Sequence, residues 1–338
     1  SFYEIYEKFE FILLDEVQNV YGWELFVNRL KRQGLNVVLT GSNARLLSKE
    51  LSTHLTGRHI PLELFPFSFR EFLKYRGLEF NIKSLTTEDK GLIKNKFNEY
   101  AQKGGFPEAL KESVIAETYL RSLYSTIINK DVVLRNKVKY VKTLKDIASY
   151  LISNHSCQMS FNKIKNVFGL RSTHTALNYV SYLEESYLFF FLKRLSYKHK
   201  ESLIANRKNY VIDTGLINAL SVKFSQNKGR LYENIAAIEL LRKKSLKDSD
   251  IFYWQDIHKN EVDFVIKQGM KTSQLIQVCY DPSDLVTKER ETRSLLKASK
   301  ELKCENLVMI TEDKGGEEKA DGKSIRLMPL WEWLLEED

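Results

Sequence analysis

Two short apolar segments near the start of the chain, each followed at once by polar residues, constrain the fold most strongly. FILL (11–14) runs directly into Asp15 and Glu16, and NVVLTGSN (36–43) repeats the change from apolar to polar. Short, continuous apolar runs are typical of parallel strands that are buried on both faces. Residues 22–33, between them, carry apolar side chains at helical spacing. This order of strand, helix and strand predicts a βαβ unit and therefore an α/β fold.

The sequence predicts that this sheet continues. A second helix is expected at about residues 43–54, and a third strand at HIPLEL (59–64). Ligands of open α/β sheets bind beyond the carboxyl ends of the strands. The two acids after the first strand and the polar residues after the second are therefore expected to face one crevice.

The residue types at this crevice suit the hydrolysis of a nucleoside triphosphate. Such sites use one Asp to hold Mg²⁺, a second carboxylate to orient the attacking water, and a polar residue on the adjacent strand to sense the γ-phosphate. Asp15 and Glu16 fit the first two roles, and Ser42 or Asn43 fits the third. The alternative is a pair of ordinary strand-end acids that are exposed to water.

Arg58, in the string LTGRH, is a candidate for a further role in the same chemistry. It is expected on the turn before the third strand, where its guanidinium can reach beyond the sheet edge. A planar and permanently charged side chain suits an arginine finger, which stabilises the charge of phosphoryl transfer. The alternative is an ordinary ion pair with an acid such as Glu63.

The middle of the chain is basic. Residues 111–210 contain 17 Lys and Arg against 7 Asp and Glu, whereas the whole chain has a net charge of +8. This excess predicts a polyanionic partner such as DNA, because phosphate neutralisation dominates affinity for nucleic acids. The alternative is a basic face that is simply solvated.

Three short helices between Leu144 and Glu185, followed by the strand FFFLKRLSY (189–197), predict a winged helix in this basic region. Winged helices also serve as protein-docking or lid-like modules, so DNA contact is one of two interpretations. The string STHT (172–175) opens the expected recognition helix. The candidate DNA contacts are the basic residues and the histidine on and around it: Lys163, Lys165, Arg171, His174, Lys193 and Arg194.

The last third returns to an α/β pattern with the element order of a PD-(D/E)xK nuclease core. Glu233 is expected on a helix and Asp263 on a strand, and the next strand carries Gln277 and Cys279 where such nucleases have a carboxylate and a Lys. A carboxamide is a poor metal ligand, and Cys cannot supply a cation. The sequence therefore predicts a degenerate nuclease site, whose capacity to bind metal stays open. Asp213 is predicted to cap the helix that follows it.

Several blocks of the chain resemble successive motifs of a prokaryotic AAA-superfamily ATPase family whose members carry a C-terminal domain of unknown function with a restriction-endonuclease-like core. The blocks are FILLDEVQNVYGWE, VVLTGSNARLLSKE, LTGRHIPLELFPFSFREFL, GGFPEAL, VIDTGL, GRLYENIAAIELL and NEVDFVI. The resemblance implies that Asp15 and Glu16 are the Walker B pair, with Mg²⁺ bound to Asp15 through water. It also implies ATP as the ligand, Ser42 or Asn43 as sensor one, and a homo-oligomer in which Arg58 is the finger.

The phosphate-binding loop of that family, GxxxxGK[ST], is absent from residues 1–338. The family places this loop well upstream of Walker B, so we expect the sequence to be a fragment that lacks its N-terminal part. The predicted organisation is the C-terminal part of an AAA-like domain (1–75), a helical lid or connector (76–140), a winged helix (141–205) and a restriction-endonuclease-like domain (206–338).

The predicted function is an ATPase coupled to a winged-helix and degenerate nuclease-fold effector that acts on DNA. The alternatives are a nucleic-acid-binding regulator with an inactive nuclease fold, and a metal-dependent nuclease.

No apolar run approaches the ~18 residues of a membrane span, so no membrane partner is expected. Three isolated cysteines indicate a reducing cytoplasm and no zinc site. KGGEEKADGK (314–323) is predicted to be a loop.

Overall fold

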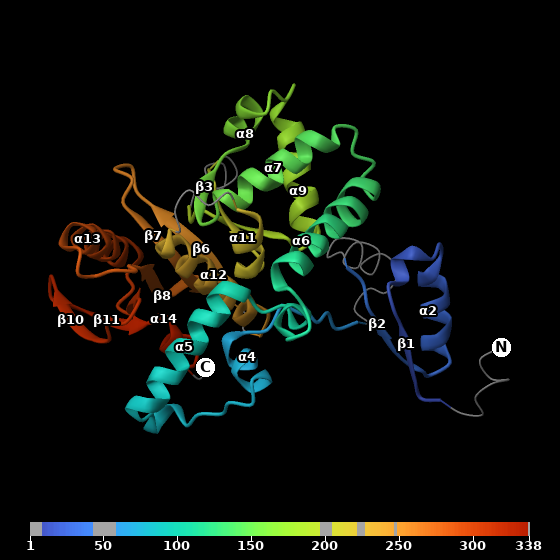
Figure 1. The fold of residues 1–338 in the computed structure, drawn as a ribbon. Helices are drawn as coiled ribbons and strands as arrows, with labels where there is room; N and C mark the ends of the chain where they lie inside the picture. Colours follow the sequence, from blue (N-terminus) through green and yellow to red (C-terminus); the bar gives the residue numbers. More distant parts are fainter. Residues whose placement is uncertain (1–8, 43–58, 197–204, 222–226, 247–248, 337–338) are drawn as a thin grey trace.

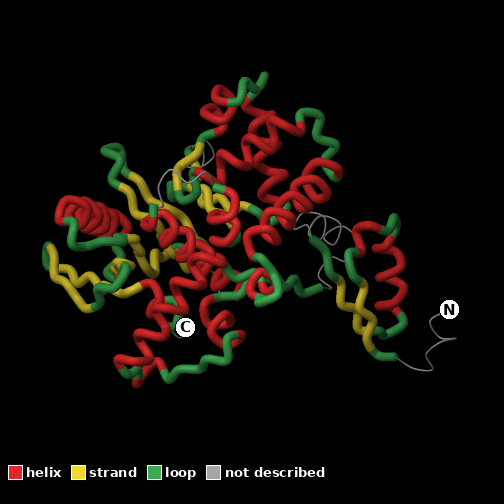
Figure 2. Tube along the Cα trace, viewed as in Figure 1, coloured by secondary structure: helices red, strands yellow, loops and turns green. Residues whose placement is uncertain are grey.

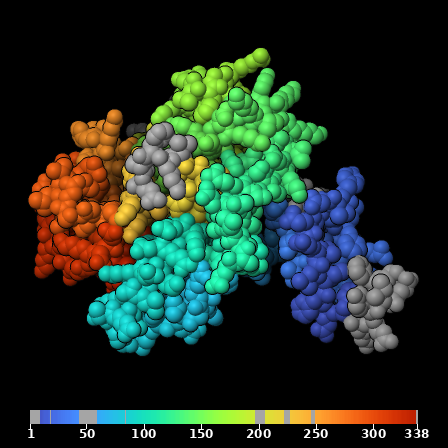
Figure 3. Space-filling model, in the orientation of Figure 1, coloured from blue at the N-terminus to red at the C-terminus, as the bar shows by residue number. Residues whose placement is uncertain are grey.

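The computed structural model describes residues 9–42, 59–196, 205–221, 227–246 and 249–336. These residues form an N-terminal unit, a largely helical middle region and a C-terminal region built on a six-stranded sheet (Figure 1). Figure 2 shows that most of the strands gather in the C-terminal region, while helices make up most of the middle. In the space-filling view the N-terminal unit stands at the right edge as a lobe of its own (Figure 3).

The N-terminal unit contains the predicted βαβ arrangement. Strands β1 (Phe11–Leu14) and β2 (Asn36–Leu39) pair in parallel, and helix α2 (Trp23–Arg32) connects them. The buried face of α2 packs on one side of this two-stranded sheet. On the other side Phe11 is 60% and Leu13 76% exposed. The prediction that the strand FILL is buried on both faces is therefore wrong for the described residues, because one helix can cover only one face of a pleated strand.

The predicted third strand is absent from the described part of this unit. Residues 59–64 form no strand, and Ile60, Leu62 and Leu64 are exposed. A strand requires a hydrogen-bonded neighbour, and no described strand pairs with this segment. The predicted helix at 43–54 lies outside the described residues.

The segment that follows is divided between two hydrophobic cores. Helices α4 (Phe69–Tyr75) and α5 (Thr87–Lys103), with the short turn η2 (Ile82–Ser84), pack through residues such as Phe97 against the C-terminal region. Ser68 and Glu71 form a capping box that fixes the start of α4. Helix α6 (Ala116–Thr126) packs instead into the core of the middle region.

The middle region is built around a small antiparallel sheet with the strand order β3-β5-β4. The helices expected between Leu144 and Glu185 and the strand after them are present, and β5 extends the sheet beyond residue 205. Its remaining elements are η3 (Pro107–Leu110), the π-helix η4 (Ile127–Leu134), α7 (Val141–Ser153), β3 (Cys157–Met159), α8 (Phe161–Val167), α9 (Thr173–Glu185), β4 (Phe189–Lys193), β5 (Arg207–Val211) and α11 (Thr214–Leu220).

The C-terminal sheet has the order β10-β11-β9-β8-β7-β6 and is mixed. Phe264 and Ile276 share a core with α12, whereas Val265 and Leu275 share one with α13, so the two helices cover opposite faces. The elements are α12 (Lys228–Leu246), β6 (Asp250–Gln255), β7 (Glu261–Gln268), β8 (Lys271–Val278), α13 (Leu285–Leu302), β9 (Leu307–Thr311), β10 (Gly316–Ala320), β11 (Lys323–Pro329) and α14 (Leu330–Trp333).

The predicted loop at 314–323 is wrong, because most of it is β10 and the turn into β11. The two turn residues, Asp321 and Gly322, have φ values of 48° and 73°. Two consecutive residues with positive φ are typical of a type I′ hairpin, and the dipeptide Asp-Gly was the sequence signal for it.

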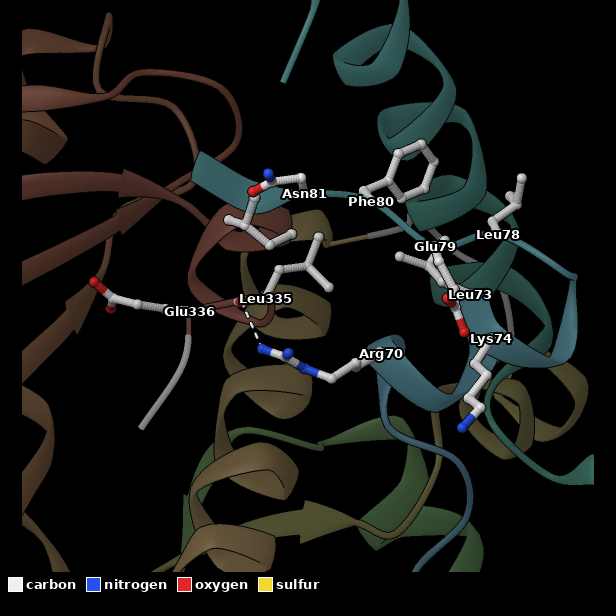
Figure 4. A pocket seen from close by; sticks show the side chains of 10 residues that line it. Arg70, Leu73, Lys74, Leu78, Glu79, Phe80, Asn81, Leu335 and Glu336 are labelled. Atoms are coloured by element: carbon white, nitrogen blue, oxygen red, sulfur yellow. Dashed lines mark hydrogen bonds between the residues drawn. The ribbon is translucent and has the colours of Figure 1, made fainter. Parts of the chain in front are cut away.

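A pocket of about 700 Å³ lies between α4, residues 78–82 and the end of α14 (Figure 4). Arg70 crosses it and donates a hydrogen bond from Nη2 to the carbonyl oxygen of Leu335 at 2.6 Å. Its wall contains none of the predicted site residues. The pocket marks where α4 docks on the C-terminal region.

Candidate functional site

The first candidate site lies at the carboxyl ends of β1 and β2. The hydroxyl of Thr40 donates a hydrogen bond to Oδ1 of Asp15 and accepts one from the backbone N–H of Glu16 at 3.1 Å. Glu16 has a left-handed backbone conformation with φ 49°, so the chain turns sharply directly after the strand. Thr40 therefore fixes the positions of both acids, a role that sequence reasoning did not assign to it.

Ser42 completes this cluster. Its Oγ lies 3.2 Å from Oε2 of Glu16, so the polar ends of the two strands meet as their parallel order predicts. The structure thus brings together Asp15, Glu16 and Ser42. Asn43 and Arg58, the other two candidates, lie outside the described residues.

One acid from the middle region joins the same cluster and was missed by sequence reasoning. Oδ1 of Asp131, on the π-helix η4, also lies 3.2 Å from Ser42 Oγ, although 89 residues separate the two in the sequence. Arg135, one turn further on, holds this carboxylate with an Nη2–Oδ1 distance of 3.2 Å. The only local signal was an acid in the mostly apolar run IINKDVVL, four residues before an arginine.

The second candidate site lies in the core between the middle and C-terminal regions. The ammonium of Lys208, on β5, lies 2.6 Å from Glu233 Oε1, 2.8 Å from Glu261 Oε1 and 2.7 Å from Asp263 Oδ1. The Lys208 side chain is only 2% exposed. Sequence reasoning predicted Glu233 and Asp263 here but missed Lys208 and Glu261.

Further hydrogen bonds hold these carboxylates in place. Asp263 Oδ2 accepts from the backbone N–H of Val278 at 2.9 Å, and Tyr210 donates to Glu233 Oε1 at 2.7 Å. Gln277 accepts from the backbone N–H of Asp263 and donates to Glu291 at 2.7 Å. Gln277 therefore acts as a neutral bridge between the backbone of Asp263 and the carboxylate of Glu291.

The charges of this cluster depend on burial. Burial alone would lower the pKa of Lys208, but the surrounding carboxylates, Asp263 first, raise it well above its ordinary value. Burial raises the pKa of Glu233 and of Asp263, and the Lys208 ammonium opposes both shifts. The pKa of the Cys279 thiol rises to about 11, also through burial. Cys279 is thus a neutral thiol near pH 7, and Lys208 is the cation of the site.

In the described part of the chain, no group of three or more His, Cys, Asp and Glu side chains is arranged to hold a metal ion. Glu233 and Asp263 were the residues whose metal binding stayed open. The Lys208 ammonium contacts both of them, at 2.6 Å from Glu233 Oε1 and 2.7 Å from Asp263 Oδ1.

Comparison with known families divides the chain into three consecutive parts. A family described as AAA domain matches residues 1–73, a domain of unknown function (DUF8612) matches residues 94–227, and a second one (DUF4143) matches residues 228–333. An uncharacterized protein of Methanocaldococcus jannaschii is 38% identical in an alignment that covers 96% of this chain and 74% of that protein. An uncharacterized protein of Haemophilus influenzae is 30% identical in an alignment that covers 96% of this chain and 78% of that protein.

The chain belongs to the family of these two proteins. Its N-terminal part carries the AAA domain match and its C-terminal part the DUF4143 match, so this much of the resemblance is confirmed. No solved structure matches the chain.

The family matches place the Lys208 cluster across a boundary. Lys208 belongs to the DUF8612 part, whereas Glu233, Glu261 and Asp263 all belong to the DUF4143 part. In this protein the DUF8612 part therefore supplies the cation that contacts the acidic side chains of the DUF4143 part.

Asp213 caps α11 as predicted, and its carboxylate also accepts a hydrogen bond from a distant part of the chain. Its carboxylate accepts hydrogen bonds from the backbone N–H groups of Gly215 at 2.8 Å and Leu216 at 3.3 Å, and from Gly105 at 2.6 Å across 108 residues. Gly105 in turn accepts from Phe67 N–H at 2.8 Å. Three of the sequence blocks that carry the resemblance, FPFSFREFL, GGFPEAL and VIDTGL, therefore converge on one buried carboxylate, which is a structural junction.

The candidate DNA contacts fall into two groups. One lies on the α8–α9 hairpin, at the top of the molecule in Figure 1, and its members Lys163, Arg171 and His174 are exposed. The other is the end of β4, where Arg194 forms a β-bridge with Tyr253 of the C-terminal sheet. Among the described residues, no helix is long and apolar enough to cross a membrane.

Proposed function

We propose that the full-length protein binds and hydrolyses ATP with Mg²⁺ through its N-terminal part. The observation that carries the proposal is the contact of Ser42 with Glu16 at the carboxyl ends of two parallel strands, within residues matched by the AAA domain family. Carboxylates at a strand end are the hard oxygen donors that suit Mg²⁺.

The proposed roles follow from the chemistry of each residue. Asp15 would hold Mg²⁺ through a water molecule, and the bound ion would neutralise charge on the phosphates. Glu16 orients the attacking water, and Ser42 or Asn43 donates a hydrogen bond to the γ-phosphate. Arg58 acts as a finger, and a homo-oligomer is proposed as the arrangement in which it works. A phosphate-binding loop must complete the site, and residues 1–338 contain none.

We further propose that this ATPase drives a winged helix and a degenerate nuclease fold. The order α7-β3-α8-α9-β4-β5 with its antiparallel sheet supports a winged helix. The order α12-β6-β7-β8-α13-β9 supports a restriction-endonuclease-like core, and Lys208 in its acidic cluster argues against metal-dependent cleavage. The proposed divisions are residues 1–75, 76–140, 141–205 and 206–338. The three free thiols suit a cytoplasmic location.

The second candidate function is a nucleic-acid-binding regulator in which ATP acts only as a switch. The exposed basic residues of the α8–α9 hairpin favour it. It predicts that nucleotide changes DNA affinity while turnover stays negligible.

The test is ATP hydrolysis by the full-length protein and its Glu16→Gln variant. The variant should bind ATP and lose at least about two orders of magnitude in turnover, because the Mg²⁺ ligand stays and the water-orienting carboxylate is gone. Glu10→Gln, at the other end of β1, is the matched control and should hydrolyse ATP normally. Wild-type turnover in the Glu16 variant would remove the proposed role.

A further inference from the structure

The turn between η4 and α7 carries a dense set of exposed basic side chains. Residues 130–146 contain six Lys and Arg against two Asp, and one of those acids, Asp131, is held by Arg135 at 3.2 Å. The lysines that follow η4 are all exposed: Lys137, Lys139, Lys142 and Lys145. In the part of the chain that the structure describes, no carboxylate forms an ion pair with any of these four. Four positive charges therefore stand close together in the sequence without a neutralising partner.

An aromatic side chain lies among these charges. Tyr140 is 60% exposed, and together with the four lysines it forms what we call the turn patch. The backbone N–H groups of Lys137 and Val138 donate hydrogen bonds to the carbonyl oxygens of Leu134 and Val133, which fixes the turn. The turn lies at the outer edge of the middle region, away from the C-terminal sheet (Figure 1). The turn patch is thus a defined surface that faces solvent.

Two members of the turn patch are poor choices for the stability of the turn. Lys137 has φ 48°, in the left-handed region that Gly adopts without a steric cost. Tyr140 is the N-cap of α7 and makes no capping hydrogen bond with its side chain, whereas Ser, Thr, Asp and Asn are the residues that make one. Residues that break a local rule are expected where function requires the side chain. A partner therefore explains Lys137 and Tyr140 better than the fold does.

The chemistry of the turn patch indicates the kind of partner. Several lysines on one surface suit the phosphates of a nucleic acid, whose neutralisation supplies most of the affinity. An exposed tyrosine ring offers a face on which an unpaired base can stack. The bases of a duplex are already stacked on one another, so the ring would find no free base there. The combination favours a single strand.

We propose that the turn patch binds single-stranded nucleic acid. The lysines contact the phosphates, and Tyr140 stacks on one base. This surface is separate from the α8–α9 hairpin with its own basic residues. The inference does not rest on the proposed ATP hydrolysis, because the turn patch lies in the DUF8612 part, outside the residues matched by the AAA domain family.

The test is a titration of fluorescent oligo(dT) of about 15 nucleotides with residues 1–338, without ATP, at several salt concentrations. Each phosphate contact of a single strand contributes about 0.7 to the slope of log K against log salt. Lys137→Gly should therefore lower the slope by about that amount. Tyr140→Ser should weaken binding at least about fivefold through the lost stacking. Tyr140→Phe keeps the ring and should bind within about twofold of the wild type.

Thermal denaturation separates binding from folding. Lys137→Gly and Tyr140→Ser should each keep or raise the melting temperature, because Gly relieves the positive φ and Ser supplies the missing cap. A purely structural role for the two side chains predicts a lower melting temperature instead. Tyr21→Ala and Lys300→Gln change an exposed tyrosine and an exposed lysine outside the turn patch. These controls should leave affinity and slope unchanged.

Several outcomes would overturn the inference. The first is oligo(dT) binding that is undetectable at low salt, or equal to that of the wild type in both Lys137→Gly and Tyr140→Ser. Displacement of oligo(dT) by polyglutamate at equal charge concentration would assign the turn patch to an acidic protein. Loss of oligo(dT) binding in a variant of the α8–α9 hairpin, but not in the turn-patch variants, would place the single strand on the hairpin. A full-length protein that fails to hydrolyse ATP overturns the proposed function and leaves this inference intact.

Discussion

Nζ of Lys208 lies 2.7 Å from Oδ1 of Asp263, and the two residues belong to parts of the chain that match different families. The same ammonium contacts Glu233 and Glu261. The C-terminal region thus receives its cation from strand β5 of the middle region. This contact ties the two regions together at the acidic cluster of the C-terminal region.

Removing that cation should destabilise the protein strongly. Lys208→Met keeps most of the side-chain stem but leaves three carboxylates, of which Glu233 and Asp263 are buried, without their counter-ion. Breaking a buried ion pair on one side typically costs about 3–5 kcal/mol. We expect the free energy of unfolding of residues 1–338, measured with urea, to fall by about that amount.

Lys163→Met is the control for this change, because Lys163 is an exposed lysine on α8. Its effect should stay within about 0.5 kcal/mol. Adding Asp263→Asn to Lys208→Met should recover part of the lost stability, because it removes one of the unpaired charges. Equal stability of Lys208→Met and Lys163→Met would show that the cluster does not need its cation.

The junction at Asp213 predicts a steric effect at Gly105. A Cβ at this position would lie 2.2 Å from the carbonyl oxygen of Phe67 and 2.9 Å from its nitrogen, and these backbone atoms cannot rotate away. Gly105→Ala should therefore cost at least about 2 kcal/mol of unfolding free energy.

Gly91→Ala is the matched control, since Gly91 lies within α5, just past its first turn, with no atom within 4 Å of an added Cβ. It should stabilise the protein by about 0.5–1 kcal/mol, because alanine has the higher helix propensity. Thermal denaturation of the two variants compares them directly. A Gly105→Ala protein as stable as the wild type contradicts the tight packing of Phe67 on Gly105.

Asp213 also predicts a pH dependence. Burial raises its pKa from 3.8 to about 6, despite the three backbone N–H groups that lower it. The folded protein therefore binds this proton more tightly than the unfolded chain. The stability from this group is fully present below about pH 4 and is lost as the pH rises through 6, a change of up to about 3 kcal/mol.

Urea denaturation at several pH values between 4 and 7 measures this slope. Asp213→Ser keeps a capping hydroxyl but does not titrate. Its stability should fall less than that of the wild type over the same range, even if it is lower throughout. Parallel pH profiles for the two proteins would assign the dependence to other groups.

The α8–α9 hairpin predicts weak, salt-sensitive binding of duplex DNA. Affinity should fall steeply between two salt concentrations, because counterion release drives phosphate contacts. The triple variant Lys163→Gln, Lys165→Gln and Arg171→Gln should lower the slope of log K against log salt by about 2–3. Lys300→Gln, an exposed lysine on α13, is the control and should leave the slope unchanged. Binding that is independent of salt, or undetectable at low salt, would favour a protein partner.

Much of the local structure followed from the sequence. The spacing of apolar residues predicted β1, α2 and β2, and the strands β6 to β9 of the C-terminal sheet. These elements are determined locally, because periods of 2 and 3.6 residues decide which side chains share a face. The parallel order of β1 and β2 also predicted that Glu16 and Ser42 would meet.

The sequence also identified the junction at Asp213, though not its geometry. GGFPEAL and VIDTGL stood out as blocks, and Asp213 was expected to cap a helix. That Gly105 donates to the same carboxylate depends on the packing of α5 against α11. The predicted third strand is a case in which the sequence pattern was misleading. HIPLEL (59–64) has a composition suitable for a strand, but a strand forms only where a neighbouring strand offers hydrogen bonds, and no described strand does so here.

Which charged side chains meet depends on the packing of distant parts of the chain. Lys208 reaches carboxylates that lie 25 to 55 residues further along the chain, and Asp131 reaches Ser42 across 89. No periodic pattern encodes such contacts, because the energy of a charge depends on its burial and on which partner the packing brings within about 3 Å. The local pattern of residues thus predicts a strand that ends in acids, whereas long-range packing selects the side chains that contact those acids.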